Sequence, residues 1–599
     1  MEHHTISKRA DAEQQFTWAT EDLFADDQLW KEELDALKAV PAQIAAYQGR
    51  LGESAATLLE YLTTYDAISL RLERLYMYAH LKGDEDTGNS VYQNMRGQAI
   101  SLLVACQSAG AFETPELLAI PEDILARFYR EQPELMTYRR RLYKIRRQKE
   151  HILTAPEEAL LAASGEMANA PDNIGSTFRN ADMKFPPAAD ENGSTHPLTM
   201  GSYIPLMESP DRKLRSSAFE NLFGTFKNYR NAFAAMLDGQ MKQLLFYTRA
   251  RKYGSTLEAS LDNTEVPTAV YHNLIRTVHE NMDKMYRYVE LRKRLMGLDE
   301  LHFYDLYTPI VSGVDLKIPF EDAKKAALEA LSVLGEDYTA LLQEGFSHRW
   351  IDVYENEGKR SGAYSSGGRP HPYVLLNHKD TLDSMFTLVH EMGHALHSYL
   401  SVKNQPQVNS EYVIFVAEVA STCNEVLLTQ HLLKNTTDKK QRAYIINHFL
   451  EQFRGTVYRQ TMFAEYELFM GQTTESGESL TADLLTEKYY ALCKEYFGPD
   501  IVADELIGME WARIPHFFYN YYVFQYATGF AAAIAIAMRI LREGAPAVAD
   551  YKKFLGSGGS DDPISLLKIA GVDMMSPAPI NDALKMFGEL LDEMEELMK

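Results

Sequence analysis

The sequence is poor in cysteine and in positive charge. Its three cysteines, Cys106, Cys423 and Cys493, are an odd number without the spacing of a metal-binding motif. This count argues against a disulfide framework and indicates a reducing compartment. The chain has 60 basic against 84 acidic residues, and its formal net charge is −24. Such an acidic balance argues against nucleic acid and anionic membranes as partners.

The sequence also lacks long apolar runs and a signal peptide. Its most apolar run, residues 530–540, is too short to span a bilayer, which takes about 20 residues. Residues 1–5 have neither the basic start nor the apolar stretch of a signal peptide. We therefore expect a cytoplasmic protein without a membrane partner, and 599 residues are enough for two or more domains.

The hydrophobic pattern is overwhelmingly helical, which predicts a mainly α fold. Residues 183–203 interrupt it with prolines and Asn192-Gly193, a pattern typical of a β-hairpin or an extended crossing. We place a domain boundary near residue 200. The expected domains are an N-terminal helical domain, 1–200, and a catalytic domain, 201–599.

The most informative stretch is His390-Glu391-Met392-Gly393-His394. Histidines four residues apart lie on one face of a helix, so both imidazoles can reach a single metal ion. Glu391 is placed to take a proton from a water on that metal. A cap at residues 380–383 and flanking apolar residues predict a helix over 381–400. Gly393 would cost such a helix about 1 kcal/mol, which indicates that something packs closely against it.

Two histidines leave a metal site incomplete. One known arrangement has a third histidine ten residues after the first, but that position is Leu400. His397 lies one helical turn beyond His394, roughly 10 Å along the axis from His390. We therefore interpret His397 as a flanking or substrate-side residue.

A carboxylate on a second helix is the remaining option for the third ligand. Residues 412–433 form an apolar segment with helical period, and Glu418 lies inside it. A charge there is costly unless it is paired with a metal or a cation. Glu418 is the predicted third ligand. Glu425 falls on the same face and could orient a ligand by a hydrogen bond, or could form a structural salt bridge.

His-Glu-Met-Gly-His at 390–394, followed by Phe-Val-Ala-Glu-Val-Ala-Ser-Thr-Cys-Asn-Glu at 415–425, resembles the thimet oligopeptidase family of zinc metallopeptidases. The resemblance is strongest to its bacterial oligoendopeptidase F branch. It implies one Zn²⁺ per chain, held by His390, His394 and Glu418, with Glu391 as the general base. It also implies two helical domains around a deep cleft that admits short peptides, with a small β-sheet beside the zinc-binding helix.

A tyrosine-rich segment at 514–529 also resembles this family. Interpreted as a helix opened by Pro515, it places Tyr519, Tyr522 and Tyr526 on one face and His516 at its start. A phenol or an imidazole near the metal can donate a hydrogen bond to the oxyanion of peptide hydrolysis. The resemblance assigns that role to His516 and Tyr526, and substrate contacts to Tyr519 and Tyr522. Aromatic stripes at this spacing also occur in cores, so a structural role stays open for all four.

Two short strands, 361–365 and 373–377, are expected before the metal-binding helix, joined by a glycine-rich turn. The resemblance implies that the substrate backbone pairs with residues 362–365, including Ala363 and Tyr364, by strand addition. The residues alone show only a glycine-rich hairpin, which could equally be structural.

The function we expect is that of a zinc-dependent endopeptidase hydrolysing internal bonds of short oligopeptides. One alternative is a peptidyl-dipeptidase or metallocarboxypeptidase acting at peptide C-termini, which would need a cationic group for the free carboxylate. Another is a peptide-binding protein without activity, against which the intact ligands and base argue. The oligomeric state is left open.

Overall fold

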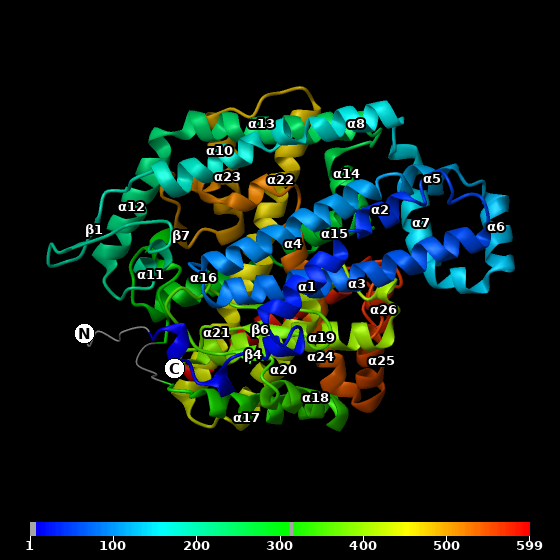
Figure 1. The fold of residues 1–599 in the computed structure, drawn as a ribbon. Coiled ribbons are helices and arrows are strands. Elements are labelled where there is room, and N and C mark those ends of the chain that lie inside the picture. The colour runs from blue at the N-terminus through cyan, green and yellow to red at the C-terminus, as the bar shows by residue number, and fades with distance from the viewer. Residues whose placement is uncertain (1–6, 312–315) are drawn as a thin grey trace. The chain divides into compact units, whose positions relative to one another are not determined.

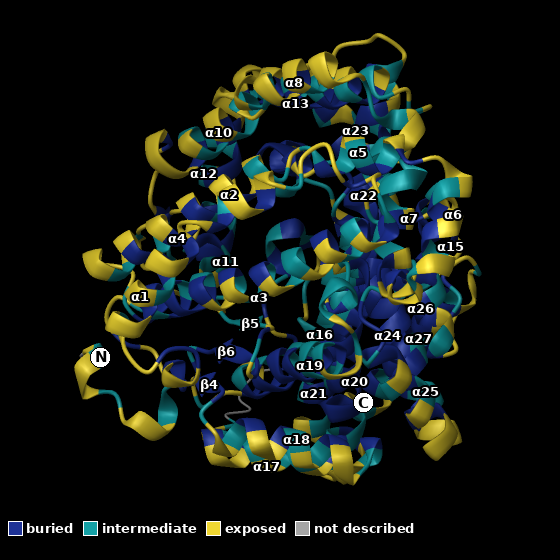
Figure 2. Ribbon diagram, turned by 45° about the vertical axis from the view of Figure 1, so that its right-hand side comes forward, coloured by how far each residue is buried: buried dark blue, intermediate teal, exposed yellow. Residues whose placement is uncertain are grey.

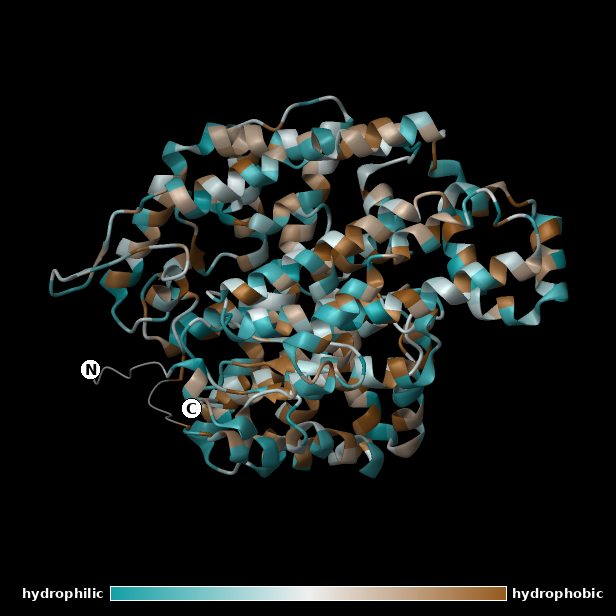
Figure 3. Cartoon of the chain, viewed as in Figure 1, coloured by the Kyte–Doolittle hydropathy of each residue, from teal (hydrophilic) through white to brown (hydrophobic). Residues whose placement is uncertain are grey.

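The computed structural model describes residues 7–311 and 316–599, and the chain is mainly α (Figure 1). About 71% of it is helical. The described strands are two or three residues long and form three small sheets. Hydrophobic and hydrophilic residues are interspersed along the helices (Figure 3), as expected when one face of each helix is buried. The predicted fold class is confirmed.

The chain divides into two compact units, and each is assembled from three segments. Unit 1 comprises Met1–Glu150, Leu316–His431 and Ile536–Gly571, and unit 2 comprises His151–Asp315, Leu432–Ala535 and Val572–Lys599. The chain changes unit inside two helices, α20 (Ile414–Asn435) and α24 (Phe524–Glu543). The compact units do not coincide with the ranges 1–200 and 201–599; that contiguous division stays a prediction, as does the cleft. Each unit is described by itself below.

Unit 1 contains an N-terminal group of helices and the helices of the metal motif. The long helix α3 begins after Ser54, whose hydroxyl accepts the N–H of Thr57. The helices that lie wholly in this unit are, in chain order, α1 (Asp27–Leu37), α2 (Val40–Ala45), α3 (Ala55–Glu85), α4 (Ser90–Ala109), α5 (Glu113–Ala119), α6 (Glu122–Glu131), α7 (Arg139–Arg147), α17 (Phe320–Leu331), α18 (Glu336–Ser347), α19 (Leu382–Asn404), α25 (Ala545–Leu555) and α26 (Pro563–Ile569).

A three-stranded sheet joins these two groups of helices. Its order is β4 (Ile351–Asp352), β6 (Tyr373–Leu375) and β5 (Tyr364–Ser366), with β4 parallel and β5 antiparallel to β6. Tyr373 and Leu375 of β6 belong to the same hydrophobic core as the N-terminal helices. The ring of Tyr373 packs edge-on against buried Trp18, with centroids 6.3 Å apart. Both β5 and β6 contact α19, so the small sheet lies beside the metal-motif helix, as predicted.

Unit 2 is a second helical body with two minimal sheets. Its predicted hairpin is present: β1 (Ala188–Ala189) pairs antiparallel with β2 (Thr195–His196), while β3 (Leu301–His302) and β7 (Ile501–Val502) are parallel. Its helices are α8 (Ala155–Ala163), α9 (Gly165–Ala168), α10 (Ala170–Thr177), α11 (Tyr203–Met207), α12 (Arg212–Asn228), α13 (Arg230–Ala250), α14 (Thr256–Asp262), α15 (Thr268–His279), α16 (Met282–Leu295), α21 (Lys439–Gln452), α22 (Arg459–Glu475), α23 (Ala482–Phe497) and α27 (Ala578–Leu597).

Helix α24 is both long and apolar. Among the described helices, α24 alone has the length and composition of a membrane span, but 72% of its apolar window is buried inside the protein (Figure 2). A buried core helix passes the same test of length and composition. Its burial supports the interpretation of residues 530–540 as part of a buried helix.

Candidate metal centre and tyrosine segment

Helix α19 carries the metal motif near its middle. The helix runs Leu382–Asn404 and is capped by Thr381, whose hydroxyl accepts the N–H of Ser384 at 3.1 Å. Leu388, Val389 and their apolar neighbours are fully buried, which anchors the motif in the core of unit 1. The helix predicted over 381–400 is therefore present, and it continues for one more turn.

His390, His394 and Glu418 converge on one point. Glu418 Oε2 lies 3.5 Å from His390 Nε2 and 3.7 Å from His394 Nε2. One potential ligand atom from each of the three residues lies within 4.8 Å of the others. Two imidazole nitrogens and a carboxylate oxygen at this separation are a donor set that fits a single metal ion, with room for a further ligand. The predicted trio is brought together by α19 and α20.

Gly393 explains how the two helices come so close. A β-carbon at this position would lie 2.6 Å from the Cα of Ser421 and 2.9 Å from the carbonyl oxygen of Ala420. Both contacts are with the backbone of α20, which cannot give way as a side chain can. The close packing predicted against Gly393 is thus present, and its partner is the turn that follows Glu418.

Glu391 is buried, and its Oε2 atom has no hydrogen-bond partner among the described residues. Burial raises the pKa of Glu391 to about 7, because desolvation outweighs the lowering by His390. A carboxyl group that exchanges its proton near neutral pH, and whose oxygen is not engaged elsewhere, is suited to general acid–base work.

The two histidines of the metal motif are held in different environments. His390 Nδ1 lies 2.5 Å from Glu425 Oε1, so its Nε2 is left to face the metal position. Burial lowers the pKa of His390, but Glu425, Glu391 and Glu418 outweigh that and raise it to about 9. Burial and His390 lower the pKa of His394 to about 3. Glu425 thus has the contact expected of a residue that orients a ligand.

His397 is placed differently from our interpretation of it. Its side chain is buried and stacks on Tyr412, with ring centroids 3.7 Å apart. Burial lowers its pKa to about 3, so it is a neutral core residue. The substrate-side interpretation of His397 is wrong, because the face of α19 that carries it packs into unit 1.

The edge strand β5 begins at Tyr364, directly after Ala363. It pairs only with β6 in its sheet, which leaves its outer edge available for a further strand. The Tyr364 hydroxyl donates to Asp84 Oδ2 at 2.9 Å, so that side chain belongs to the structure of unit 1. Any substrate contact at Ala363 and Tyr364 therefore involves the backbone.

The tyrosine segment does not form the continuous helix that we predicted. A 3-10 turn, η12 (Pro515–Phe518), is followed by a loop, and α24 starts only at Phe524. Asn520 and Tyr521 adopt positive φ angles of 53° and 60°, which end any right-handed helix. The periodic spacing was misleading because tertiary contacts fix this backbone.

Glu467 on α22 supplies the main contact. This buried carboxyl group accepts the N–H of Tyr521 at 2.8 Å and also hydrogen-bonds to the backbones of Tyr522 and Val523. These donors lie just before α24, where a helix leaves N–H groups without intrahelical partners. Glu467 therefore both caps α24 and holds the loop.

The side chain of Tyr521 is fixed as firmly as its backbone. Its hydroxyl lies 2.8 Å from Thr256 Oγ1 and sits over Gly471, where a β-carbon would collide with it. Gln240 Nε2 donates to the Phe518 carbonyl at 3.0 Å and to Asn520 Oδ1 at 3.1 Å. The loop is thus held from α13, α14 and α22 at once.

The aromatic rings of the segment form one cluster within unit 2. The His516 ring centroid lies 5.5 Å from that of Tyr519, 6.3 Å from Tyr522 and 6.2 Å from Tyr526. Tyr519 is the most open, with 49% of its surface exposed. Burial lowers the pKa of His516, which favours a neutral imidazole. The metal trio with Glu391 in unit 1 and these four residues in unit 2 therefore form two separate clusters of predicted residues.

Sequence reasoning missed Glu467. A weaker form of the signal that indicated Glu418 was present, since Glu467 stands with Glu465 in the otherwise apolar segment Ala464–Met470. What the sequence did not show is that its partners are backbone groups more than fifty residues further along the chain.

Comparisons with known proteins identify the family of the chain. The profile of Peptidase family M3 matches residues 205–586, and that of Oligopeptidase F matches residues 116–185. The chain belongs to peptidase family M3. It is 48% identical to oligopeptidase PepF of Bacillus subtilis (strain 168), over 99% of this chain and 89% of that protein.

Two solved structures share the fold across nearly the whole chain. A protein from Chlamydophila abortus matches with a TM-score of 0.92 and 35% identity, covering 99% of this chain and 100% of that one. Oligoendopeptidase-F from Enterococcus faecium matches with a TM-score of 0.75 and 39% identity, covering 95% and 99%. The chain is therefore a peptidase of the oligoendopeptidase F kind, and His390, His394 and Glu418 are placed so that they could hold a metal ion.

Proposed function

We propose that this protein is a zinc-dependent endopeptidase that hydrolyses internal bonds of short peptides in the cytoplasm. The observation that carries the proposal is the convergence of His390, His394 and Glu418, with the unpartnered carboxyl of Glu391 next to a ligand. Two histidines and one glutamate are the ligand set of a catalytic zinc that keeps an open position. The oligopeptidase names of the relatives support peptides as the substrate class.

Each residue of the proposed site has a separate role in catalysis. Zinc, when bound, supplies a Lewis acid that polarises the scissile carbonyl and makes water a better nucleophile. Glu391 accepts the proton of the attacking water and passes it to the amine that leaves. Glu425 holds the His390 ring so that Nε2 faces the metal position. The edge of β5 aligns the peptide backbone at Ala363 and Tyr364.

We assign oxyanion stabilisation to the tyrosine segment. Tyr526 and His516 each offer a donor that can form a hydrogen bond as negative charge develops on the carbonyl oxygen. Tyr519, which is half exposed, and Tyr522 contact the substrate. Variants of Tyr526 test this assignment.

The test is cleavage of a quenched fluorescent peptide blocked at both ends, with products identified by mass spectrometry. We expect internal cleavage that a chelator abolishes and added Zn²⁺ restores. Exclusive release of C-terminal fragments from unblocked peptides, with blocked peptides left intact, would instead establish a peptidyl-dipeptidase or carboxypeptidase.

Two variants test the assigned roles. Glu391→Gln should retain zinc and lose at least about 100-fold in kcat, the worth of general-base catalysis; the exposed Glu336→Gln is the matched control. Tyr526→Phe should lower kcat by about 100-fold, as for loss of an oxyanion donor, with little change in KM. Full activity of either variant contradicts its assigned role.

A further inference from the structure

Two arginines of unit 1 share one buried carboxylate beside the edge strand β5. The carboxylate is that of Asp84 at the end of α3, which is only 1% exposed. Its Oδ2 lies 3.2 Å from Arg360 Nη1, and its Oδ1 lies 3.8 Å from Arg96 Nη1 on α4. Burial lowers the pKa of the neighbouring His80, so that ring adds no charge at neutral pH. The group therefore holds two positive charges and one negative charge.

Both guanidinium groups can be reached from solvent. The side chain of Arg360 is 51% exposed and that of Arg96 is 39% exposed. The backbone of Arg360 is fixed, because its N–H donates to the Asp84 carbonyl at 3.0 Å and its carbonyl accepts from Asn377 Nδ2 at 3.0 Å. A guanidinium has five N–H donors in a rigid plane, so a contact with Asp84 does not use all of them. Arg360 is thus an anchored cation with an exposed head.

The hydrogen bonds of the sheet show which residue of β5 faces its open edge. The Val374 N–H donates to the Trp350 carbonyl at 2.8 Å, toward β4. Backbone groups alternate in direction along a strand, so the neighbours of Val374 face β5. Tyr364 and Ser366 pair with those neighbours and face β6 in return. Ser365, between them, directs its N–H and carbonyl to the open edge, where a peptide strand can bind.

A peptide strand on this edge would bring one of its side chains to Arg360. The guanidinium carbon of Arg360 lies 5.4 Å from the ring centroid of Tyr364, in a cation–π contact. Side chains at neighbouring positions of adjacent strands point to the same face of a sheet, with β-carbons about 4.5–5.5 Å apart. The substrate residue aligned with Tyr364 therefore directs its side chain toward the face that carries Arg360.

We propose that Arg360, with Arg96 beside it, selects an acidic side chain, Asp or Glu, at the substrate residue aligned with Tyr364. This inference rests on the proposed function and adds a side-chain preference to it. A planar guanidinium offers paired donors that match a carboxylate. In a chain with a net charge of −24, the field of the whole protein repels acidic peptides, so a local pair of cations is needed to select them.

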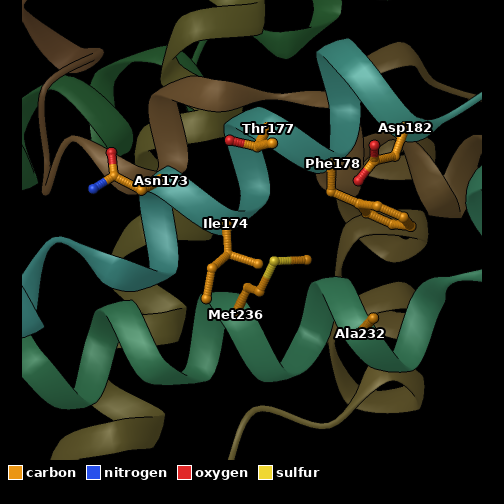
Figure 4. A pocket seen from close by; sticks show the side chains of 7 residues that line it. All are labelled: Asn173, Ile174, Thr177, Phe178, Asp182, Ala232 and Met236. Atoms are coloured by element: carbon orange, nitrogen blue, oxygen red, sulfur yellow. The ribbon is translucent and has the colours of Figure 1, made fainter.

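A cavity in unit 2 has the opposite chemistry. It measures about 510 Å³ and lies between α10 and α13, where Ile174 and Met236 point toward one another (Figure 4). The charged residue in its lining is Asp182, a carboxylate, and none of its lining residues is a cation. That cavity does not suit an acidic side chain, so a preference for Glu would not arise from it.

The test uses peptides blocked at both ends that carry either Glu or Gln at successive positions around the scissile bond. Wild-type protein should prefer Glu at one position by about 2- to 5-fold in kcat/KM, the worth of a half-exposed ion pair. Added salt should weaken this preference. Arg360→Met should abolish it and Arg360→Lys should keep part of it. Arg127→Met removes an equally exposed cation from α6 of the same unit and should leave the preference intact.

Charge reversal distinguishes recognition from a structural role. Arg360→Glu should prefer Lys to Gln, and Gln to Glu, at the same position. Loss of Arg360 as a purely structural residue would lower all rates alike, so an unchanged ratio of Glu to Gln cleavage in Arg360→Met and Arg360→Glu would overturn the inference. Equal cleavage of all peptides by wild-type protein would overturn it as well. If Arg360→Glu does not fold, Arg360→Met and Arg360→Lys decide the question, because only the first removes the charge.

Binding measurements separate this inference from the proposed function. Calorimetry on Glu391→Gln protein gives the affinities for the Glu and Gln peptides without turnover. A 2- to 5-fold tighter Glu peptide, with the difference lost on adding Arg360→Met, supports the site even if hydrolysis fails. Equal affinities together with normal hydrolysis by wild-type protein refute the site and leave the proposed function standing.

Discussion

The metal centre and the tyrosine segment are held in place by different kinds of structure. The candidate metal ligands lie on two regular helices, α19 and α20, and the helical repeat itself aligns His390 with His394. The tyrosine segment is irregular, with two left-handed residues, and its shape comes from Glu467 and its neighbours. One cluster is thus shaped by its own sequence, and the other by contacts from distant helices.

This difference predicts that the two clusters fail in different ways. Damage to the metal centre should remove the metal, whereas damage to the support of the tyrosine segment should leave the metal bound and lower turnover. Metal content and kcat, measured together on each variant, separate the two cases.

The largest effect is expected for Glu418→Ala. Removing the carboxylate leaves only two protein ligands, so zinc content and activity should fall by more than the roughly 10- to 100-fold that loss of an outer partner costs. The zinc content and activity of Glu425→Ala should decrease by an amount within that range, and those of the exposed Glu411→Ala should match wild type. Unchanged zinc content in Glu418→Ala would exclude it as a ligand.

Glu467→Ala should disturb the tyrosine segment and leave the metal centre unaffected. Each backbone donor left unsatisfied in a buried site costs about 1–3 kcal/mol, so the free energy of unfolding should fall and the loop should loosen. Zinc content should stay at the wild-type level while kcat drops. Glu467→Gln keeps an acceptor oxygen and should recover much of the rate; equal kcat for wild type and Glu467→Ala would refute the supporting role.

A smaller effect is expected for Gly393→Ala, which tests the spacing of α19 and α20. The added methyl group overlaps the backbone of Ser421, and overpacking of this kind costs about 1–3 kcal/mol. Metal affinity should fall as well, because Glu418 moves with that turn. Gly97→Ala, on an exposed helical face with open space, should be neutral or stabilising by up to about 1 kcal/mol. If both variants behave alike, the close approach is unimportant.

The most gradual effect is expected from pH. Burial raises the pKa of Glu467 from 4.5 to about 8, despite its backbone hydrogen bonds. The folded protein therefore holds a proton that the unfolded chain releases between these values, so this group makes stability fall as pH rises from 4.5 to 8. In urea unfolding, the free energy of unfolding should fall less steeply with pH in Glu467→Gln than in wild type, by at most about 1.4 kcal/mol per pH unit. A steeper fall in the variant would contradict the sign.

The same contrast explains which features could be predicted from the sequence. The facing of His390 and His394 is a local property of helices, and an isolated acid in an apolar segment indicated Glu418. The loop at 519–523 was predicted as helix because its aromatic spacing fits one. Its true conformation depends on Glu467, Gln240 and Gly471, and nothing within the segment reports those contacts.

Gly393 has a consequence for how relatives of this protein are found. The metal motif is commonly written with two free positions between the glutamate and the second histidine. Here only the first position, Met392, has room for a side chain. The second, Gly393, has no room for a β-carbon beside Ser421. A search pattern that requires glycine at this place, with a small residue about 28 positions downstream, would therefore select chains whose third ligand arrives on a closely packed second helix.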